Sequence, residues 1–387
     1  PNYQFTLQGS GTDPRMSNEE GHYAFPMMPQ GGQYKINPYN NNDVTNGVST
    51  LDLILIQRHI LGISTFENPY QYIAADINNS QSLTSTDLLV LRKVILGIYE
   101  EFPDNTSWRA FDAAYEFVDP TNPLAEELPE DYLISSLESD MDVDFIGVKV
   151  GDVNASYDLG LTEGLSSETR SNSNVELFLE RGAGSTFNAV ANEALDIAGM
   201  QFTINMAGAE ITDIYSPYFT PGQIAWVRTA SGKYNVSISN YATIEFAKED
   251  VLFTIETECG DCEHLIPSLD YSGNLKAEAY VNSAIEIADL SIEYRDQNSQ
   301  QQFYVTQNKP NPWADATEIS ISSIGHNVAD MRVFDINGRL VYNISLKLRD
   351  GINVVQINDD MIPHSGIFYY EIVSGKQKAQ FKMIKLR

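Results

Sequence analysis

Short runs in which apolar and polar residues alternate occupy most of the second half of the chain. Examples begin at Val175, Gly199, Tyr234 and Val251, and turn residues separate them. Alternation with a period of two is typical of strands that bury one face. Several such runs with turns between them are typical of a β-sandwich, so we expect residues 175–297 to form one.

Two predicted helices stand in the first half of the chain and repeat each other. Residues 52–62 and 87–97 share an initial Asp-Leu and a final Ile-Leu-Gly, at an offset of 35 residues. Each fits a helix of about three turns that ends at a glycine in the left-handed conformation. Both are apolar on most faces, so we expect residues 50–97 to pack against residues 175–297 of the same chain.

The first 39 residues form a separate segment rich in Gly, Pro, Tyr and Asn. The alternating residues 21–25 and 33–38 flank a Gly/Pro turn and predict two short strands. This pattern resembles the closing strands of a carboxypeptidase-regulatory-like or Cna-B-type module. The resemblance implies that the rest of the module lies upstream of Pro1, so we expect this chain to be the C-terminal part of a longer protein.

We therefore predict a mainly β, multidomain chain of β-sandwiches with one small α-helical module. The predicted segments are a partial β-sandwich at 1–39, the helical repeat with an extension at 40–158, a linker at 159–174, the central sandwich at 175–297, a second linker at 298–304, and a C-terminal β-domain at 305–387.

The charge of the chain excludes some partners. The formal net charge is −29, and a field of this sign repels phosphate, so we expect no nucleic-acid partner. The longest apolar runs have four residues, whereas a membrane helix needs about 20, so we expect no membrane span. Residues 305–387 carry +2, which leaves −31 for the rest and supports a domain boundary.

The loop before each repeated helix has oxygen-bearing residues at the spacing of a calcium-binding loop. Ca²⁺ takes six to eight oxygen ligands, and such a loop supplies them from positions 1, 3, 5, 7 (backbone carbonyl) and 12. The expected ligands at these positions are Asn41, Asp43, Thr45, Gly47 and Asp52 in the first loop, and Asp76, Asn78, Ser80, Ser82 and Asp87 in the second.

Two such units in tandem, each closed by Ile-Leu-Gly, resemble a type I dockerin module. The resemblance implies bound calcium and a cohesin-like partner, in the same chain or in a neighbour. Asn41 replaces the usual first Asp, and neither loop has Gly at position 6, so we expect modest affinity. The alternative is that both loops are Asn/Asp-rich turns that cap the helices.

A further acidic stretch runs from Asp140 to Asn154. Its alternating residues Asp140, Asp142 and Asp144 would offer a third cation site on a loop, but we favour a solvated face. The two cysteines, Cys259 and Cys262, are close in sequence. We expect a small loop disulfide, with a reduced pair as the alternative.

The central β segment resembles a cohesin-like or carbohydrate-binding-module-like sandwich. Trp226, Tyr234 and Tyr241 could stack on a sugar there, but aromatic residues on sandwich strands are more often core, and we expect them to be core.

The C-terminal segment has the most specific pattern. Asn337-Gly338 is a strong signal for a two-residue hairpin turn, and Ser374-Gly375-Lys376 predicts the last hairpin. The order of its motifs resembles the C-terminal sorting domain of type IX secretion cargo in Bacteroidetes. The residues that carry this resemblance, here called the sorting motif residues, are Asn308, Pro310, Asn311, Pro312, Asp335, Gly338, Arg339, Gly366, Lys382 and Lys385.

This resemblance implies export through the periplasm and outer membrane to the cell surface, and handling by a translocon, a shuttle and a sortase. The five histidines lie in no catalytic or metal motif, and G-x-S-x-G, H-E-x-x-H and P-loop motifs are absent, so we expect no enzyme activity. We expect the non-catalytic stalk and sorting region of an adhesin-type surface protein. The alternatives are a cohesin–dockerin-like scaffold and the tail of an extracellular hydrolase.

Overall fold

The computed structural model describes residues 3–9, 11, 13–158, 170–259, 265–273, 275–295, 303–323, 328–349, 351–362, 364–375 and 377–386. The chain divides into two compact units, residues 1–295 and 296–387. Most of both predicted linkers lies outside the described residues, as does Cys262. In the described part of the chain, no helix is long and apolar enough to cross a membrane.

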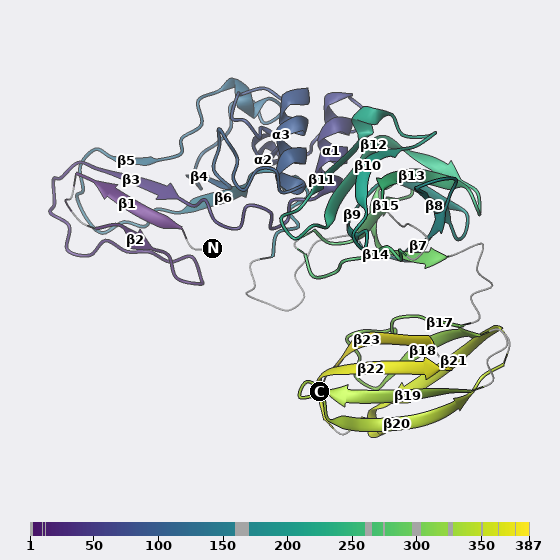
Figure 1. The fold of residues 1–387 in the computed structure, drawn as a ribbon. Helices are drawn as coiled ribbons and strands as arrows, with labels where there is room; N and C mark the ends of the chain where they lie inside the picture. Colours follow the sequence, from purple (N-terminus) through teal and green to yellow (C-terminus); the bar gives the residue numbers. More distant parts are fainter. Residues whose placement is uncertain are drawn as a thin grey trace. The chain divides into compact units, whose positions relative to one another are not determined.

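A small antiparallel sheet with the order β2-β1-β3-β5 lies at the N-terminal end of the first unit (Figure 1). Its strands are β1 (Gln4–Gln8), β2 (Arg15–Met16), β3 (Tyr34–Tyr39) and β5 (Tyr132–Ile134). The strand that we expected at residues 21–25 is absent. Instead, the Tyr23 ring stacks on Phe5 at a centroid distance of 3.7 Å, so this segment covers the sheet through side chains rather than by strand pairing.

The helical module contains α1 (Thr50–Ile60), α2 (Pro69–Ala75) and α3 (Ser85–Ile95). Gly62 and Gly97 follow α1 and α3 with φ of 68° and 77°, as the predicted left-handed ends require. The antiparallel strand pair β4 (Trp108–Asp112) and β6 (Phe145–Lys149) and the short helix η1 (Pro123–Ala125) complete the module. The three helices and this extension share one apolar core, which includes Leu53, Leu91 and Val148.

The central domain is one ten-stranded sheet with the order β10-β13-β8-β7-β16-β15-β9-β12-β11, and β14 pairs with β9. The strands are β7 (Arg170–Arg181), β8 (Thr186–Ala191), β9 (Leu195–Asn205), β10 (Glu210–Tyr215), β11 (Ile224–Arg228), β12 (Tyr234–Phe246), β13 (Val251–Glu258), β14 (Ser268–Leu269), β15 (Glu278–Val281) and β16 (Glu286–Arg295), with η2 (Pro221–Gln223) before β11. Edge strands β10 and β11 approach each other, so the sheet wraps around a single core. The strand β7 begins inside the predicted linker 159–174.

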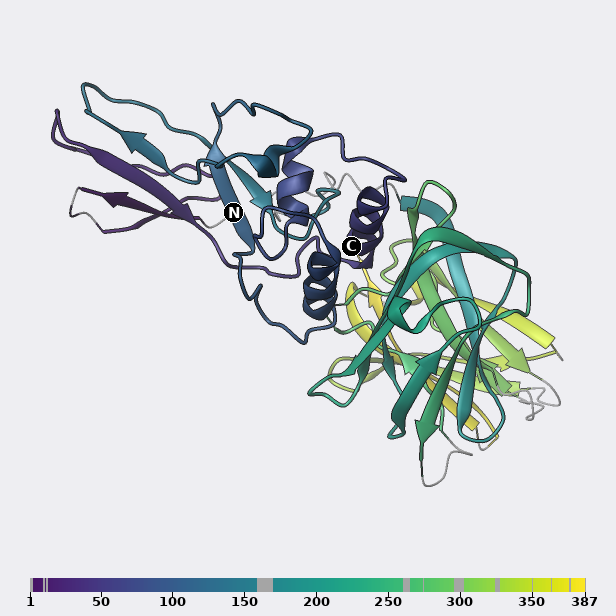
Figure 2. The ribbon, with the colours of Figure 1, turned by 90° about the horizontal axis from the view of Figure 1, so that it is seen from above.

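The helical module packs directly on this domain. Helix α1 lies against β9 and β12, and both views show it beside the sheet (Figures 1 and 2). The Ile54 side chain is fully buried in a cluster with Ala198, Tyr280 and Ile287 of the sheet. Gly199 leaves room for this contact, because a Cβ there would approach Ile54 Cδ1 to 3.1 Å.

The second unit is a sandwich of two antiparallel sheets, β17-β18-β21 and β20-β19-β22-β23. The elements are β17 (Phe303–Val305), β18 (Ala316–Ser323), β19 (Val328–Asp335), β20 (Leu340–Lys347), β21 (Gly351–Asn358), η3 (Asp359–Met361), β22 (Gly366–Ser374) and β23 (Gln377–Lys385). One apolar core takes residues from both sheets. The mainly β, multidomain prediction is thus confirmed.

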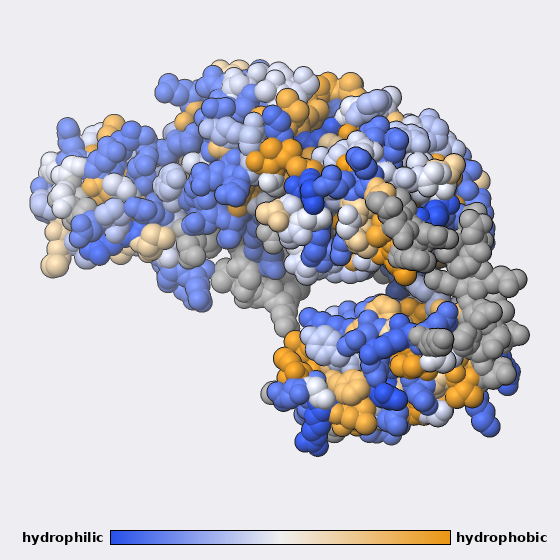
Figure 3. Space-filling view, in the orientation of Figure 1, coloured by the Kyte–Doolittle hydropathy of each residue, from blue (hydrophilic) through white to orange (hydrophobic). Residues whose placement is uncertain are grey.

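Polar residues cover most of the face of the first unit that Figure 3 shows.

Candidate functional site

The second predicted calcium loop brings its expected ligands together. The Asp76 carboxylate accepts hydrogen bonds from the Ser80 amide (2.8 Å) and the Gln81 amide (2.9 Å). Asp87 Oδ1 accepts a hydrogen bond from the backbone amide of Asn78 at 3.3 Å. The Ser80 hydroxyl donates to the carbonyl of Ser82 at 3.1 Å. Asn78 Oδ1 also accepts a hydrogen bond from the backbone amide of Ser80 at 3.2 Å. The side chains at positions 1, 3, 5 and 12 and the carbonyl at position 7 therefore meet in one loop.

The two carboxylates of this loop are fully buried and close to each other. Burial raises the pKa of Asp76, and the nearby charge of Asp87 adds to this effect. Two buried carboxylates are costly unless a cation or hydrogen bonds compensate them. The donor set of two carboxylates, an amide, a hydroxyl and a carbonyl oxygen suits the oxygen preference of Ca²⁺.

The first predicted loop is arranged differently. Asn41 Oδ1 accepts a hydrogen bond from the Ser107 amide (2.8 Å), and its Nδ2 donates to Glu101 (3.3 Å). Asp43 and Thr45 are exposed. Ser107 also donates through its hydroxyl to the carbonyl of Asn42, so the start of this loop is bound to the residues before β4. Only Gly47 and Asp52 of the five expected ligands lie at the buried end of the loop.

The residues that meet Asp52 come from the far end of the module. The Val153 amide donates to Asp52 Oδ1 at 2.9 Å, and both Asp52 and Asp152 are buried. Burial and then the charge of Asp152 raise the pKa of Asp52 well above its usual range, and burial raises the pKa of Asp152 to about 6. A Cβ on Gly47 would approach Asp152 Oδ2 to 2.5 Å, so this position requires glycine.

Sequence reasoning did not place Asp152, Asn154 or Ser156 near Asp52 and Gly47, where the structure brings them. They belong to the acidic stretch 140–154 and its continuation, where we expected only a solvated face. A usable signal existed, because the pattern Asp-x-Asn-x-Ser occurs at 76–80 and again at 152–156. A search for the repeated half-loop, rather than for a complete loop before each helix, would have found it.

A lysine accompanies the second pair of carboxylates. Lys149 is buried, and its ammonium donates to the carbonyl of Val44 at 2.9 Å. Burial lowers the pKa of Lys149 to about 8, although the charges of Asp152, Asp52 and Asp43 act in the opposite direction. In the described part of the chain, no three His, Cys, Asp or Glu side chains form a group that could hold a metal by themselves. A cation here would therefore need amide, hydroxyl or carbonyl ligands as well.

Hydrogen bonds tie the helical module to the central sheet. The Thr50 amide donates to Gln201 Oε1 (2.7 Å), and the Thr50 and Ser237 hydroxyls are 2.8 Å apart. Arg92 donates to the Gly222 carbonyl (2.5 Å) and to Ser239 Oγ (2.7 Å). We call the surface that α1 and α3 present to the sheet, with Thr50, Ile54, Arg58 and Arg92, the docking face; Arg58 donates to the Tyr241 carbonyl.

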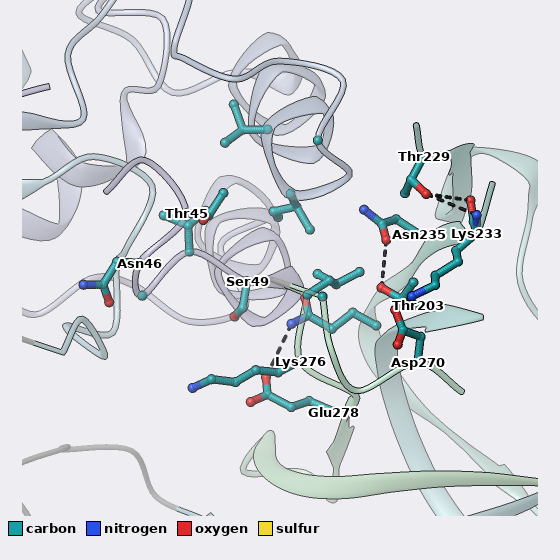
Figure 4. Close-up of a pocket in the computed structure, with 18 of the residues that line it drawn as sticks. Thr45, Asn46, Ser49, Thr203, Thr229, Lys233, Asn235, Asp270, Lys276 and Glu278 are labelled. Carbon is teal, nitrogen blue, oxygen red and sulfur yellow. Dashed lines mark hydrogen bonds and ion pairs between the residues drawn. The ribbon is translucent and has the colours of Figure 1, made fainter. Parts of the chain in front are cut away.

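A cavity of about 270 Å³, lined by both polar and apolar residues, lies beside the docking face (Figure 4). Its polar side chains bind one another: Lys233 pairs with Asp270 at 2.5 Å, and Thr203 donates to Asn235 at 2.8 Å. Asn235 also donates to the Leu96 carbonyl after α3 (3.0 Å). These contacts make the cavity part of the joint between the helical module and the sheet.

The aromatic residues considered for sugar stacking do not form a platform. Tyr234 is buried and its hydroxyl accepts a hydrogen bond from the Ile211 amide (3.1 Å), whereas Tyr241 is exposed. Trp226 meets Tyr234 edge-on at 6.0 Å. The structure records Cys259 as disulfide-bonded, but Cys262 lies outside the described residues, so the pairing of the two remains a prediction.

Several sorting motif residues hold the second unit together. Asn308 is fully buried and donates to Thr317 Oγ1 (2.9 Å) and to the Pro310 carbonyl (3.1 Å). Asn311 Oδ1 accepts from the Ile384 amide at 2.8 Å. Lys385 is buried and donates to the carbonyl of Ile362 at 2.7 Å. Lys382, by contrast, is exposed.

The remaining sorting motif residues lie at turns and strand ends. Asp335 Oδ1 accepts bonds from the amides of Asn337 and Arg339, both at 2.9 Å. The hairpin between β19 and β20 is present, but its connection is longer than the expected two-residue turn. Only Gly338 has positive φ there (77°), and the register shifts beside it, so the turn ends in a glycine bulge.

Comparisons with known proteins identify two parts of the chain. The model of the secretion system C-terminal sorting domain matches residues 310–386, and that of the dockerin type I domain matches residues 40–112. No curated protein matches. Both matched parts agree with the resemblances drawn from the sequence.

Solved structures give only weak likenesses. The CARDB domain of the PF1109 protein from Pyrococcus furiosus is 17% identical over 24% of this chain and 98% of its own, with a TM-score of 0.18. PorZ, a surface component of the type IX secretion system of Porphyromonas gingivalis, is 14% identical over 54% of this chain and 30% of its own, with a TM-score of 0.17. A β-glucosidase from Listeria innocua is 14% identical over 30% and 20%, with a TM-score of 0.16. At these TM-scores none of them carries an argument.

The sorting domain match decides the destination of the protein. A sorting domain of this kind directs its carrier through the type IX secretion system to the cell surface or the extracellular space. The chain is therefore that of a secreted type IX cargo protein, with a dockerin type I domain in its first unit and a C-terminal sorting domain in its second.

Proposed function

We propose that the chain is the non-catalytic, calcium-stabilised stalk and sorting region of an adhesin-type protein displayed on the cell surface. In this role the second unit directs export, and the first unit forms a firm connection between the surface and the adhesive part. The dockerin type I domain works as an internal joint of the stalk.

The packing of the docking face is the observation that carries this proposal. Ile54 is fully buried between α1 and the central sheet, and Thr50 and Arg92 hydrogen-bond across the same contact. A buried apolar contact with hydrogen bonds around it is typical of a stable joint between domains. Such a joint keeps the helical module and the sheet in one body, as a stalk under tension requires.

Calcium binding is supported by the donor set of the second loop, which Asp76, Asn78, Ser80, Ser82 and Asp87 supply. Bound calcium would neutralise the two buried carboxylates and hold the start of α3 to the end of α2. Loops with only two carboxylates suit extracellular modules, whose dissociation constants are on the order of 10⁻⁴–10⁻³ M.

Surface display allows a direct test of the stalk. The chain with an N-terminal epitope tag would be displayed on type IX-competent cells as wild type, Ile54→Asp and the control Ile60→Asp. Ile60 is on the same helix but 38% exposed. We expect protease to release the tag faster from Ile54→Asp only, at equal initial display. Equal release from all three would contradict a joint at the docking face.

The adhesive and non-catalytic parts need their own measurements. Cells displaying the adhesin-type protein should be retained on arrays of glycans and matrix proteins better than cells displaying residues 296–387 alone, and equal retention would contradict adhesion. The purified chain should not turn over glycoside, ester or peptide substrates. Turnover that a point substitution abolishes would contradict the non-catalytic role.

A second candidate function is supported by the dockerin type I match: the helical module could bind a cohesin-like domain of another molecule, as part of a scaffold. The two functions differ in where the docking face binds. The stalk uses it within one chain, whereas the scaffold needs it free for a partner.

A further inference from the structure

Two segments far apart in the chain make the same hydrogen bonds. The carboxylates of Asp76 and Asp152 each accept one bond from the amide four residues later and one from the amide five residues later. These distances are 2.8 and 2.9 Å for Asp76 and 2.9 Å twice for Asp152. The residue three positions after each aspartate has positive φ, 52° at Asn79 and 55° at Ala155. Residues 152–157 thus repeat the first half of the second calcium loop.

The second half of that loop is repeated elsewhere, before α1. In the second loop the Ser80 hydroxyl donates to the carbonyl of Ser82 at 3.1 Å. The corresponding bond of the other segment runs from the Ser156 hydroxyl to the carbonyl of Gly47 at 3.0 Å. These two partners are 109 residues apart in the sequence. Gly47 therefore takes the place of position 7, although it comes from a different stretch of chain.

The helices that close the two loops also begin in the same way. The Thr84 amide donates to Asp87 Oδ2 at 2.9 Å, and the Ser49 amide donates to Asp52 Oδ2 at 2.9 Å. The remaining oxygen of Asp52 accepts from the Val153 amide, which joins the two halves. Asn46 and Asp158 also exchange hydrogen bonds of 2.8 and 3.0 Å beside the junction.

One polar atom at this junction lacks a partner. Asn154 Oδ1 is buried and has no hydrogen-bond partner in the structure. Asn154 holds position 3 after Asp152, as Asn78 does after Asp76, and position 3 supplies a side-chain oxygen in calcium loops. A buried acceptor without a donor is costly, and a cation would satisfy it.

We propose that the first calcium site of this protein is split between the two ends of the helical module. Its ligands are Asp152, Asn154 and Ser156 from the segment after β6, with the Gly47 carbonyl and the Asp52 carboxylate from the segment that begins α1. The segment 152–156 lies outside the dockerin match at 40–112. The inference rests on the calcium binding proposed above and changes which residues provide it.

The split arrangement has a structural consequence. An ion bound there ties the end of the extension to the start of α1, so it closes a loop of about 100 residues, whereas the ion of the second loop closes only 12. The extension between β4 and β6 is then an integral part of the metal-binding module.

The test counts calcium ions on the full chain by native mass spectrometry and calorimetric titration with Ca²⁺ alone. We expect two ions on the wild type, one on Asp152→Asn, one on Asp76→Asn and none on the double variant. Asn154→Ala leaves the charge of the site unchanged and should lower the calcium affinity of one site. Loss of a group that only hydrogen-bonds to a metal ligand lowers affinity by roughly 10–100-fold, and loss of Asn154 as a direct ligand should lower it more. Hydrogen exchange at residues 152–157 should slow when calcium is added to the wild type and not to Asp152→Asn.

Asp43→Asn is the matched control. Asp43 is exposed, and it would be a ligand only if the first site were formed by the consecutive residues 41–52. The variant should keep both ions. Loss of an ion in Asp43→Asn with both retained in Asp152→Asn would overturn the split site in favour of residues 41–52. One ion on the wild type, removed by Asp76→Asn, would overturn the split site and leave the proposed calcium stabilisation intact. No ion on the wild type would overturn both the split site and the proposed calcium stabilisation. The Lys149 ammonium would then be the charge that compensates Asp52 and Asp152.

Discussion

Asn308 illustrates how a residue of a recognition motif acts within a fold. Its side-chain amide donates to Thr317 and to the Pro310 carbonyl, and its backbone amide donates to the Tyr370 hydroxyl at 2.9 Å. The residue is fully buried, so the secretion machinery cannot contact it in the folded unit. Its presence in the motif is explained by the shape that it gives to the segment before β18.

Replacement of Asn308 by alanine should therefore destabilise the second unit. The change removes three side-chain hydrogen bonds from a buried site, to Thr317, the Pro310 carbonyl and Gln307, which costs about 2–3 kcal/mol. Calorimetry of the full chain should show a lower melting temperature for that unit only. Lys382→Ala, at an exposed motif position, is the control and should melt as the wild type does. An unchanged melting temperature for Asn308→Ala, together with lost export, would instead indicate direct recognition.

His59 provides a prediction for pH. Its Nδ1 accepts a hydrogen bond from the Phe66 amide (3.1 Å), and the two rings stack at 4.1 Å. Burial lowers the pKa of His59 below its ordinary value near 6.5. The folded state thus favours the neutral ring, so this contribution to stability is complete above about pH 6.5 and is lost as the pH falls further.

The wild type should consequently lose more stability than His59→Gln between pH 7.5 and 5.5. Thermal melting of both proteins across this range is the measurement. Parallel curves would show that protonation of His59 does not weaken the connection between α1 and α2.

At the scale of elements, predicted residues come together where the sequence signal is continuous. The second predicted calcium loop spans 12 successive residues, 76–87, the last three of which lie in the first turn of α3, and the structure brings its five predicted ligands together. The proposed split site was not predicted because its halves, at 47–52 and 152–156, are far apart in sequence, and no local pattern indicates that they meet. Residues 21–25 alternate like a strand but pack as rings over the first sheet, because alternation alone does not specify a pairing partner.

Removal of calcium should loosen these elements selectively. A chelator should increase amide hydrogen exchange at residues 76–87 and 49–52, because the buried carboxylates there lose their counter-charge. The parallel pair β7 and β16 in the same unit is an internal reference and should exchange at an unchanged rate. Identical exchange at residues 76–87 with and without chelator would contradict calcium stabilisation.

At the scale of the whole molecule, the chain combines an acidic first unit with a compact second unit that matches a sorting domain. β17 (Phe303–Val305) pairs with β18, so the folded second unit begins before the boundary of 305 predicted from sequence. β23 pairs along the full length of β22 and contributes Met383 to the core. The packing of α1 on the central sheet was expected from the apolar helices, but the contributing sheet residues, such as Gly199, were not predictable from one sequence.

Residues 296–387 fused to an exported reporter should carry it to the surface of type IX-competent cells. A fusion that lacks residues 378–387 should remain in the periplasm, because β22 loses its partner strand and the core loses Met383. Surface fluorescence of the two fusions is the measurement. Equal surface display would show that the terminal strand has no part in sorting.

The central claim is that the docking face binds within its own chain. Sedimentation velocity of the full chain in calcium, from about 1 to 100 μM, tests it most directly. The account predicts a monomer at every concentration, because Ile54, Thr50 and Arg92 already contact the central sheet. Concentration-dependent dimers in the wild type that Ile54→Asp abolishes and Ile60→Asp retains would show that the docking face binds a second molecule, and would contradict the account.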